Sequence, residues 1–109
     1  MSRFSDILAR LQATIDARKG SDPASSYTAK LLAGGPALAA KKFGEEAIET
    51  ALAAVQADPD AVAAESADLI YHWLVLLAAC GVSLDDVAAK LEAREGRSGI
   101  EEKASRPPA

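Results

Sequence analysis

The apolar positions of this chain recur every three or four residues, which is the spacing of one face of an α-helix. Near the N-terminus the apolar side chains are those of Phe4, Ile7, Leu8, Leu11 and Ile15. The sequence shows neither the alternation of apolar and polar residues that marks a half-buried strand nor an internal repeat. The pattern therefore predicts an all-α fold.

Residues that begin and end helices divide the chain into five predicted helices. Ser2 is a candidate N-cap, Asp58 precedes a proline at a first helical position, and Gly81 suits a helix C-terminus. Ser83 and Asp86 have the spacing of a capping box. The predicted helices cover Phe4–Ile15, a short segment from Ser25 or Ser26 to Leu32, Pro36 to about Gln56, Pro59 to about Ala79, and a last segment that ends near Glu95–Gly96.

The fourth predicted helix is apolar on almost every side from Leu69 to Ala79. A helix of that kind must be buried all round, and a chain of 109 residues has few helices with which to cover it. We expect an antiparallel bundle of about five helices that homodimerisation completes, with Tyr71 and Trp73 in the core or at the dimer interface. The alternative is a monomeric bundle with this helix at its centre. The domain is expected to span 1–96, followed by a loose polar tail over 97–109.

The charge balance and the cysteine content argue against several classes of protein. The formal net charge is −4 and the pI is near 4.9, whereas a nucleic-acid-binding protein is normally basic. The N-terminus lacks the apolar core of a signal peptide, and no uncharged run reaches the ~18 residues of a membrane span. Cys80, the one cysteine, lies in an apolar run and is expected to be a small buried hydrophobe. We expect a cytoplasmic protein with neither a nucleic-acid nor a membrane partner.

Two clusters of acidic residues lie on consecutive predicted helices. The third helix carries Glu45, Glu46 and Glu49, and the fourth carries Glu65 and Asp68. Residues three apart share a helix face, so each cluster presents a pair of carboxylates to one side. In an antiparallel pair of helices the two clusters can face each other, and carboxylates that close need cations between them. Their oxygen atoms suit Mg²⁺, Mn²⁺ or Ca²⁺. The alternative is that these acids form ordinary solvated helix faces.

Basic residues stand close to the acidic clusters. Lys41 and Lys42 precede the glutamates by about one turn, and they either form ion pairs with them or contact substrate phosphates. Lys30 is a further candidate for phosphate binding. His72 lies four residues after Asp68, so it either orients that aspartate, touches substrate, or is a core histidine hydrogen-bonded to Asp68.

The acidic pattern resembles that of a known superfamily. Glu-Glu-x-x-Glu, then fifteen residues, then Glu-x-x-Asp is similar to the signature of the MazG-like all-α nucleoside-triphosphate pyrophosphohydrolases. Three flanking segments narrow the resemblance to the phosphoribosyl-ATP pyrophosphatase family, namely Ser26–Leu32, Lys41–Ala47 and Ala67–His72. The similarity extends over nearly the whole chain, from about Phe4 to Lys103.

The resemblance implies an all-α enzyme that hydrolyses phosphoribosyl-ATP to phosphoribosyl-AMP and pyrophosphate, the second step of histidine biosynthesis, with Mg²⁺ or with Mn²⁺ in its place. A house-cleaning pyrophosphohydrolase of non-canonical or deoxy-NTPs would share the metal motif and is the alternative enzyme. A structural or metal-binding helical dimer is the alternative of another class. A ferritin-like site would place histidine three residues after Glu65, where this chain has Asp68.

The resemblance also implies roles for individual residues. The implied metal ligands are Glu46, Glu49, Glu65 and Asp68. The implied catalytic residues are Glu45, Glu46 and Glu49, of which Glu45 is an extra ligand or an acceptor that positions water or metal. The expected substrate-binding residues are Lys30, Lys41, Lys42 and His72. Hydrolysis of this kind needs no protein nucleophile, so water is the expected nucleophile and a motif glutamate the proton acceptor.

Overall fold

The structure, a computed structural model, describes residues 2–96, and within them it contains five α-helices and no strand. The helices are α1 (Arg3–Ala17), α2 (Tyr27–Ala33), α3 (Gly35–Val55), α4 (Pro59–Cys80) and α5 (Leu84–Glu92). The predicted all-α fold is therefore confirmed. The tail predicted over 97–109 lies outside the described residues, as does the last part of the sequence resemblance.

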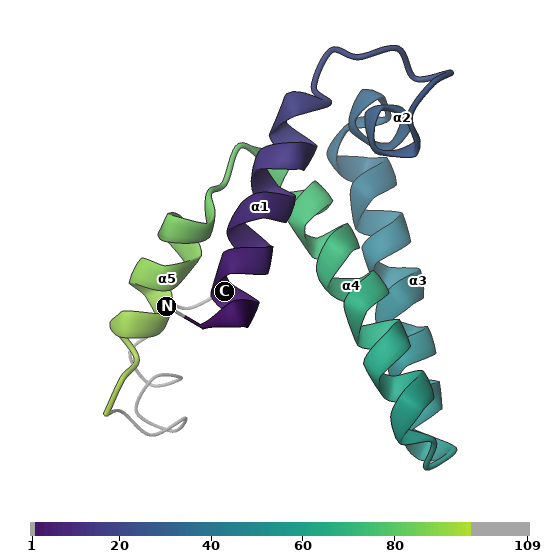
Figure 1. Cartoon of the computed structure of the whole chain (residues 1–109), viewed down its shortest axis with the longest axis vertical. Helices are drawn as coiled ribbons and strands as arrows, with labels where there is room; N and C mark the ends of the chain where they lie inside the picture. The colour runs from purple at the N-terminus through teal and green to yellow at the C-terminus, as the bar shows by residue number, and fades with distance from the viewer. Residues whose placement is uncertain (1, 97–109) are drawn as a thin grey trace, which may run out of the picture.

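The two long helices α3 and α4 form an antiparallel hairpin, and they lie side by side along their length (Figure 1). The hairpin reverses direction within residues 56–58, where Ala57 adopts a left-handed φ of 56°. Asp58 then caps α4, because its Oδ1 accepts a hydrogen bond of 3.1 Å from the backbone N–H of Ala61. Pro59 follows at the first helical position, where the N–H that it lacks would have no partner.

The core lies at the end of the hairpin where α3 begins and α4 ends. There α1 and α2 pack against α4, and α2 also contacts α3 (Figure 1). Apolar side chains from four helices meet in this region and are almost completely buried, namely Ile15, Leu31, Ala39, Leu74 and Val75. The remaining length of the α3–α4 hairpin extends away from this core as a separate arm (Figure 1).

The single chain does not bury α4 on every side, and whether a second copy covers the rest stays a prediction. Of its residues, only His72, Leu74 and Val75 are buried, while most of the apolar side chains around them are half-buried. Cys80 is exposed, so the prediction of a buried cysteine is wrong for the single chain. The reason is that the chain turns away at Gly81 with a left-handed φ of 71°, and α5 then diverges from the hairpin instead of covering α4 (Figure 1).

By length and apolar content, α4 could cross a membrane, with a mean hydropathy of 1.3 over 18 residues of which 17% are buried. A single helix of this kind is weak evidence for a membrane span, since core helices of water-soluble proteins meet the same test. In this chain the acidic residues Glu65 and Asp68 interrupt the apolar stretch of α4. The observation that matters for the fold is that α4 keeps apolar surface that the single chain leaves uncovered.

The predicted helix starts agree with the structure. Ser2 caps α1, Ser26 rather than Ser25 caps α2, and Ser83 with Asp86 forms the complete capping box of α5. The predicted end of the last helix is wrong by about three residues, because α5 ends at Glu92 and residues 93–96 form turns. None of the described α5 residues is buried, so packing does not extend this helix further.

Replacing Asp58 with alanine removes the side-chain cap of α4 and should lower the free energy of unfolding by about 1 kcal/mol. Urea unfolding followed by far-UV circular dichroism measures the difference. Asp58→Asn is the matched control, because asparagine accepts the same hydrogen bond and should keep nearly the wild-type stability. Equal losses in the two variants would show that the cap hydrogen bond contributes nothing.

Candidate functional site

Three carboxylates from the two arms of the hairpin meet in one place. Glu46 and Glu49 project from α3, and Glu65 projects from α4. One carboxylate oxygen from each residue lies within 4.8 Å of the other two. We call these residues the carboxylate triad. The spacing of three between the α3 glutamates places both on one helix face, and the antiparallel hairpin supplies the third, as the sequence predicts.

Two oxygen atoms of the carboxylate triad are buried and lack a hydrogen-bond partner within the described part of the chain. They are Oε2 of Glu46 and Oε2 of Glu65. A buried polar atom without a partner destabilises a protein, and a charged one does so more strongly. Hard oxygen donors gathered in this way match what Mg²⁺ and Mn²⁺ require, so the donor set fits a divalent cation.

Two members of the carboxylate triad, Glu46 and Glu65, have raised pKa values. Partial burial raises the pKa of Glu46 above its ordinary value of 4.5, and the charge of Glu49 raises it further. The same two causes, in the same order, raise the pKa of Glu65. Asp68 contributes a smaller increase to both. The negative charge of Glu49 therefore opposes the ionisation of both Glu46 and Glu65.

Two of the predicted acidic site residues lie outside the carboxylate triad. Asp68 follows Glu65 by three residues on α4, but its side chain is exposed. Glu45 is also exposed, and its Oε2 lies 3.5 Å from Nζ of Lys42. This ion pair is one of the two arrangements that the sequence left open for Lys42. Both partners are partly exposed, so the pair adds little to stability.

His72 is buried and connects α4 to α2. Its Nδ1 lies 2.8 Å from the backbone carbonyl oxygen of Asp68, and its Nε2 lies 3.3 Å from the hydroxyl of Tyr27. A carbonyl oxygen can only accept, so the Nδ1–H group donates the hydrogen bond to the backbone of Asp68, and Nε2 forms the hydrogen bond to the Tyr27 hydroxyl. Among the sequence alternatives, the structure favours a core histidine hydrogen-bonded to Asp68, through its backbone and not its carboxylate.

The sequence analysis missed a group of aromatic residues around His72. The rings of Tyr27 and Tyr71 stack with centroids 6.4 Å apart, and His72 meets both rings edge-on. The hydroxyl of Tyr71 is hydrogen-bonded to that of Thr28 on α2. A signal was available, because Tyr71 and His72 stand three and four residues after Asp68 and so belong to the helix faces around it.

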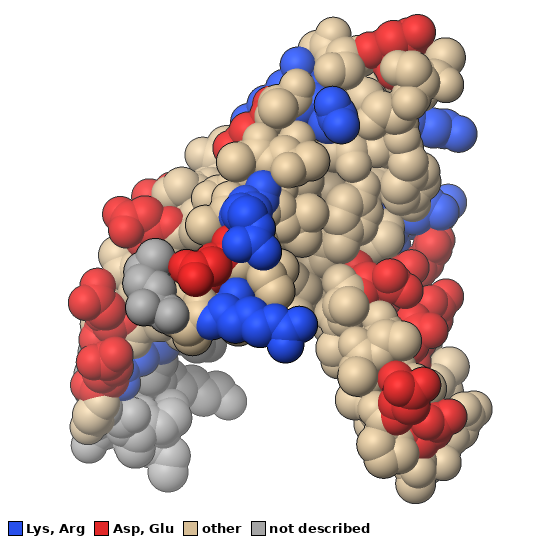
Figure 2. Space-filling model, in the orientation of Figure 1, with Lys and Arg blue, Asp and Glu red and all other residues tan. Residues whose placement is uncertain are grey.

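The lysines predicted to bind substrate differ in their surroundings. Lys30 on α2 and Lys41 on α3 are exposed, whereas Lys42 is half-buried beside Glu45. Figure 2 shows Lys and Arg side chains above a group of Asp and Glu side chains along the α3–α4 arm. The chain thus places positive charge next to its acidic residues, although its net charge is negative.

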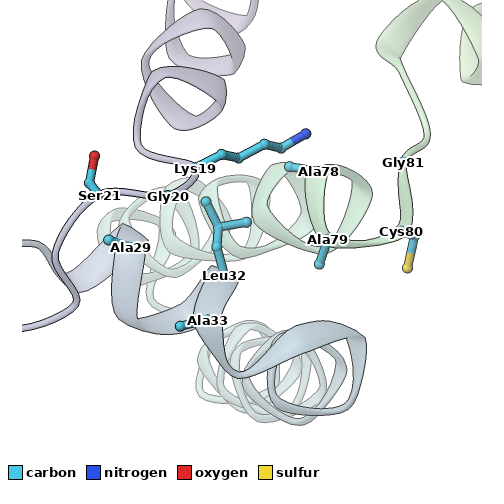
Figure 3. A pocket seen from close by; sticks show the side chains of 10 residues that line it. All are labelled: Lys19, Gly20, Ser21, Ala29, Leu32, Ala33, Ala78, Ala79, Cys80 and Gly81. Atoms are coloured by element: carbon cyan, nitrogen blue, oxygen red, sulfur yellow. The ribbon is translucent and has the colours of Figure 1, made fainter.

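A depression of about 570 Å³ lies at the C-terminal end of α4, between that helix, α2 and the segment that follows α1 (Figure 3). Small side chains line most of it, among them Ala29, Ala33 and Ala79, and Cys80 lies at its edge. Lys19 is the one charged residue among those that line it, and it forms an exposed ion pair of 3.5 Å with Asp16. No member of the carboxylate triad lines this depression, so it is not part of the acidic site.

Replacing Glu49 with glutamine should stabilise the metal-free protein near pH 7. A carboxyl whose pKa is raised by folding binds protons more tightly in the folded state, so the free energy of unfolding falls as pH rises above 4.5. Removing the charge of Glu49 relieves this loss for Glu46 and Glu65, and the gain should shrink as pH falls toward 4.5. Urea unfolding in EDTA at several pH values measures both effects.

Glu45→Gln is the matched control for this experiment, because Glu45 lies outside the carboxylate triad and forms an exposed ion pair. It should give no stabilisation near pH 7. A Glu49→Gln protein that is less stable than wild type throughout the pH range would contradict the inferred repulsion.

The sequence of the chain is similar to that of one enzyme family over most of its length. The family described as phosphoribosyl-ATP pyrophosphohydrolase matches residues 8–95. A phosphoribosyl-ATP pyrophosphatase of Caulobacter vibrioides strain NA1000 is 72% identical over 104 residues, which are 95% of this chain and 96% of that protein. The enzyme of the same name from Caulobacter sp. strain K31 is 68% identical over 98% of this chain and 99% of its own length. A third, from Cereibacter sphaeroides strain KD131, is 60% identical over 92% and 97%. With its helical fold and its acidic α3–α4 site, the chain belongs to the phosphoribosyl-ATP pyrophosphohydrolase family.

Proposed function

We propose that this chain hydrolyses phosphoribosyl-ATP to phosphoribosyl-AMP and pyrophosphate, as a cytoplasmic enzyme of histidine biosynthesis. The observation that carries the proposal is the carboxylate triad, in which buried oxygen atoms of Glu46 and Glu65 have no partner among the described residues. Relatives up to 72% identical are named for this activity, and the match covers almost their whole length.

The carboxylate triad is proposed to hold Mg²⁺, with Asp68 as a fourth ligand from the next turn of α4. Mn²⁺ has the same preference for oxygen ligands and is expected to replace it. A divalent cation, when bound, neutralises charge on the polyphosphate and makes water more acidic. Its charge would also offset the burial and the repulsion from Glu49, which together raise the pKa of Glu46 and Glu65.

The residues around the carboxylate triad are proposed to orient the substrate and to move one proton. Glu45 is exposed beside the triad and is free to accept a proton from water or to position it, in exchange for its weak contact with Lys42. Lys30, Lys41 and Lys42 supply positive charge for the substrate phosphates that the acidic residues would otherwise repel. His72 fixes the position of α2 relative to the backbone at Asp68 through its two hydrogen bonds.

The direct test is pyrophosphate release from phosphoribosyl-ATP with and without Mg²⁺, beside ATP and dUTP. We expect fast Mg²⁺-dependent release from phosphoribosyl-ATP alone. Glu49→Gln should lower the rate by at least about a hundredfold, because it removes a ligand and an ionised oxygen from the proposed metal site. Glu92→Gln on α5, which changes an exposed acid outside the site, is the matched control and should keep wild-type activity.

The substrate panel separates the alternatives. Release from dUTP or ATP in preference to phosphoribosyl-ATP would keep the metal chemistry and overturn the pathway assignment. A folded protein that releases no pyrophosphate from any of these nucleotides would overturn the enzymatic function and favour a structural helical dimer.

We also propose that the working form is a homodimer whose second copy covers the apolar surface of the hairpin. Ile48, Leu52 and Val55 are spaced four and three apart on α3, and 64%, 53% and 83% of their surfaces are exposed. Large apolar side chains in one exposed stripe are typical of a protein–protein interface. The stripe borders Glu49, so a second copy seated there would approach the carboxylate triad.

Replacing Leu52 with glutamate places a charge in the middle of this stripe and should convert the dimer into a monomer. Analytical ultracentrifugation of wild type and variant measures the change. Ala54→Glu is the matched control, because Ala54 is exposed on the same helix but is not among its large exposed apolar side chains. A wild-type protein that sediments as a monomer at all concentrations would contradict the proposed dimer.

A further inference from the structure

Tyr27 is both exposed and fixed in place. It leaves 53% of its surface open to solvent, yet its hydroxyl is hydrogen-bonded to Nε2 of His72 at 3.3 Å. One side of the ring stacks against Tyr71 with an interplanar angle of 22°. An exposed tyrosine on a helix surface is ordinarily free to change rotamer, whereas these contacts hold Tyr27 in one orientation.

The residues that hold Tyr27 in place are connected to the candidate functional site. His72, which holds the hydroxyl, is itself anchored to the backbone carbonyl of Asp68 at 2.8 Å. Tyr71, which holds the ring, is hydrogen-bonded to Thr28, the residue after Tyr27. Two hydrogen bonds in series therefore join Tyr27 to the α4 segment that carries Glu65 and Asp68.

A shallow depression lies beside Tyr27. Its lining consists of Tyr27, Lys30 and residues 23–26, and its volume is about 590 Å³. None of the described residues that line it is acidic, although the chain as a whole carries a net charge of −4. Lys30 follows Tyr27 by three residues, so the ammonium group and the ring share one face of α2.

An aromatic ring that is fixed beside a cation, and joined by hydrogen bonds to the helix that carries acidic site residues, suits one class of ligand. Flat bases stack on aromatic side chains with little dependence on their identity, and a lysine attracts a phosphate as a point charge. A ring that is already ordered before binding loses little conformational entropy when a base is placed on it.

Resting on the function proposed above, we propose that the exposed face of Tyr27 is the platform on which the purine base of the substrate stacks. Lys30 binds the phosphate of the phosphoribosyl group that this base carries. The polyphosphate extends past His72 to the carboxylate triad. In this arrangement the residues on α2 recognise the base and its substituent, and the residues on α3 and α4 act on the phosphoanhydride.

The test measures nucleotide binding in EDTA, where neither metal nor hydrolysis contributes. AMP and phosphoribosyl-AMP are titrated into the full-length protein in a calorimeter. Tyr27→Leu removes the ring and should weaken the binding of both nucleotides by about fivefold or more, which is the lower end of the effect of losing a base–aromatic stack. Tyr27→Phe keeps the ring and should bind both within about twofold of wild type.

Two further variants complete the design. Lys30→Gln should weaken the binding of phosphoribosyl-AMP by about fivefold. It should leave the binding of AMP nearly unchanged, because AMP lacks the second phosphate. Phe4→Leu is the matched control, since Phe4 is the other aromatic residue with more than half of its surface exposed (57%) and lies on α1. It should bind both nucleotides like wild type. Circular dichroism and thermal unfolding verify that each variant is folded.

The outcomes separate this inference from the proposed function. If the Tyr27→Leu variant binds AMP like wild type, the proposed stacking on Tyr27 is wrong. It is also wrong if the wild-type protein shows no saturable binding of either nucleotide. Tyr27→Phe that is as weak as Tyr27→Leu shows that the hydroxyl, not the ring, is responsible, and also overturns it. In steady-state hydrolysis, Tyr27→Leu should raise KM about fivefold with kcat within about twofold. Failure of wild-type protein to hydrolyse phosphoribosyl-ATP overturns the proposed function alone, because nucleotide binding in EDTA is measured independently.

Discussion

The repulsion among Glu46, Glu49 and Glu65 is the constraint that the α3–α4 hairpin has to accommodate. One carboxylate oxygen of each residue lies within 4.8 Å of the other two, and Oε2 of Glu46 and of Glu65 is shielded from water. The attraction that holds the two helices together must therefore come from elsewhere along the hairpin. It comes from small side chains such as Ala39 and Ala53, which are buried and allow close packing, and from the cap at Asp58. The acidic site lies within the length of α3 and α4. Packing between the two helices elsewhere along the hairpin can therefore oppose the repulsion among the carboxylates.

This arrangement divides the chain into a part that carries out chemistry and a part that positions it. The carboxylates lie on the hairpin arm, and the core of Ile15, Leu31, Leu74 and Val75 lies at its end. His72 is located where the two parts join, and its hydrogen bonds to Tyr27 and to the backbone of Asp68 connect them. Because the histidine binds the carbonyl and not the carboxylate, the side chain of Asp68 stays free to reach a cation.

Local patterns in the sequence predict the helices and the carboxylate triad well, because both depend on short spacings. Caps at Ser2, Asp58 and Ser83 lie within three residues of the atoms that they bind, and the i,i+3 rule brings glutamates to one helix face. The contact between Tyr27 and His72 spans 45 positions, and no periodicity encodes it. The exposure of Cys80 could not be predicted from the residues around it either, since it depends on the direction that the chain takes after Gly81. The sequence left two arrangements open for Lys42, and the structure has its ion pair with Glu45, a member of the acidic motif that lies outside the carboxylate triad.

The three-residue connection between α3 and α4 has a consequence for how the chain folds. Most contacts between elements are made within this hairpin, between segments that are neighbours in sequence, so the loop that must close is short. Chains dominated by such local contacts fold quickly, and helical hairpins are among the fastest. The hairpin can form before α1 packs against it, because α1 is joined to it through the separate segment that contains α2. The carboxylate triad would then be assembled early in folding, with its like charges close together before the remaining helices are in place.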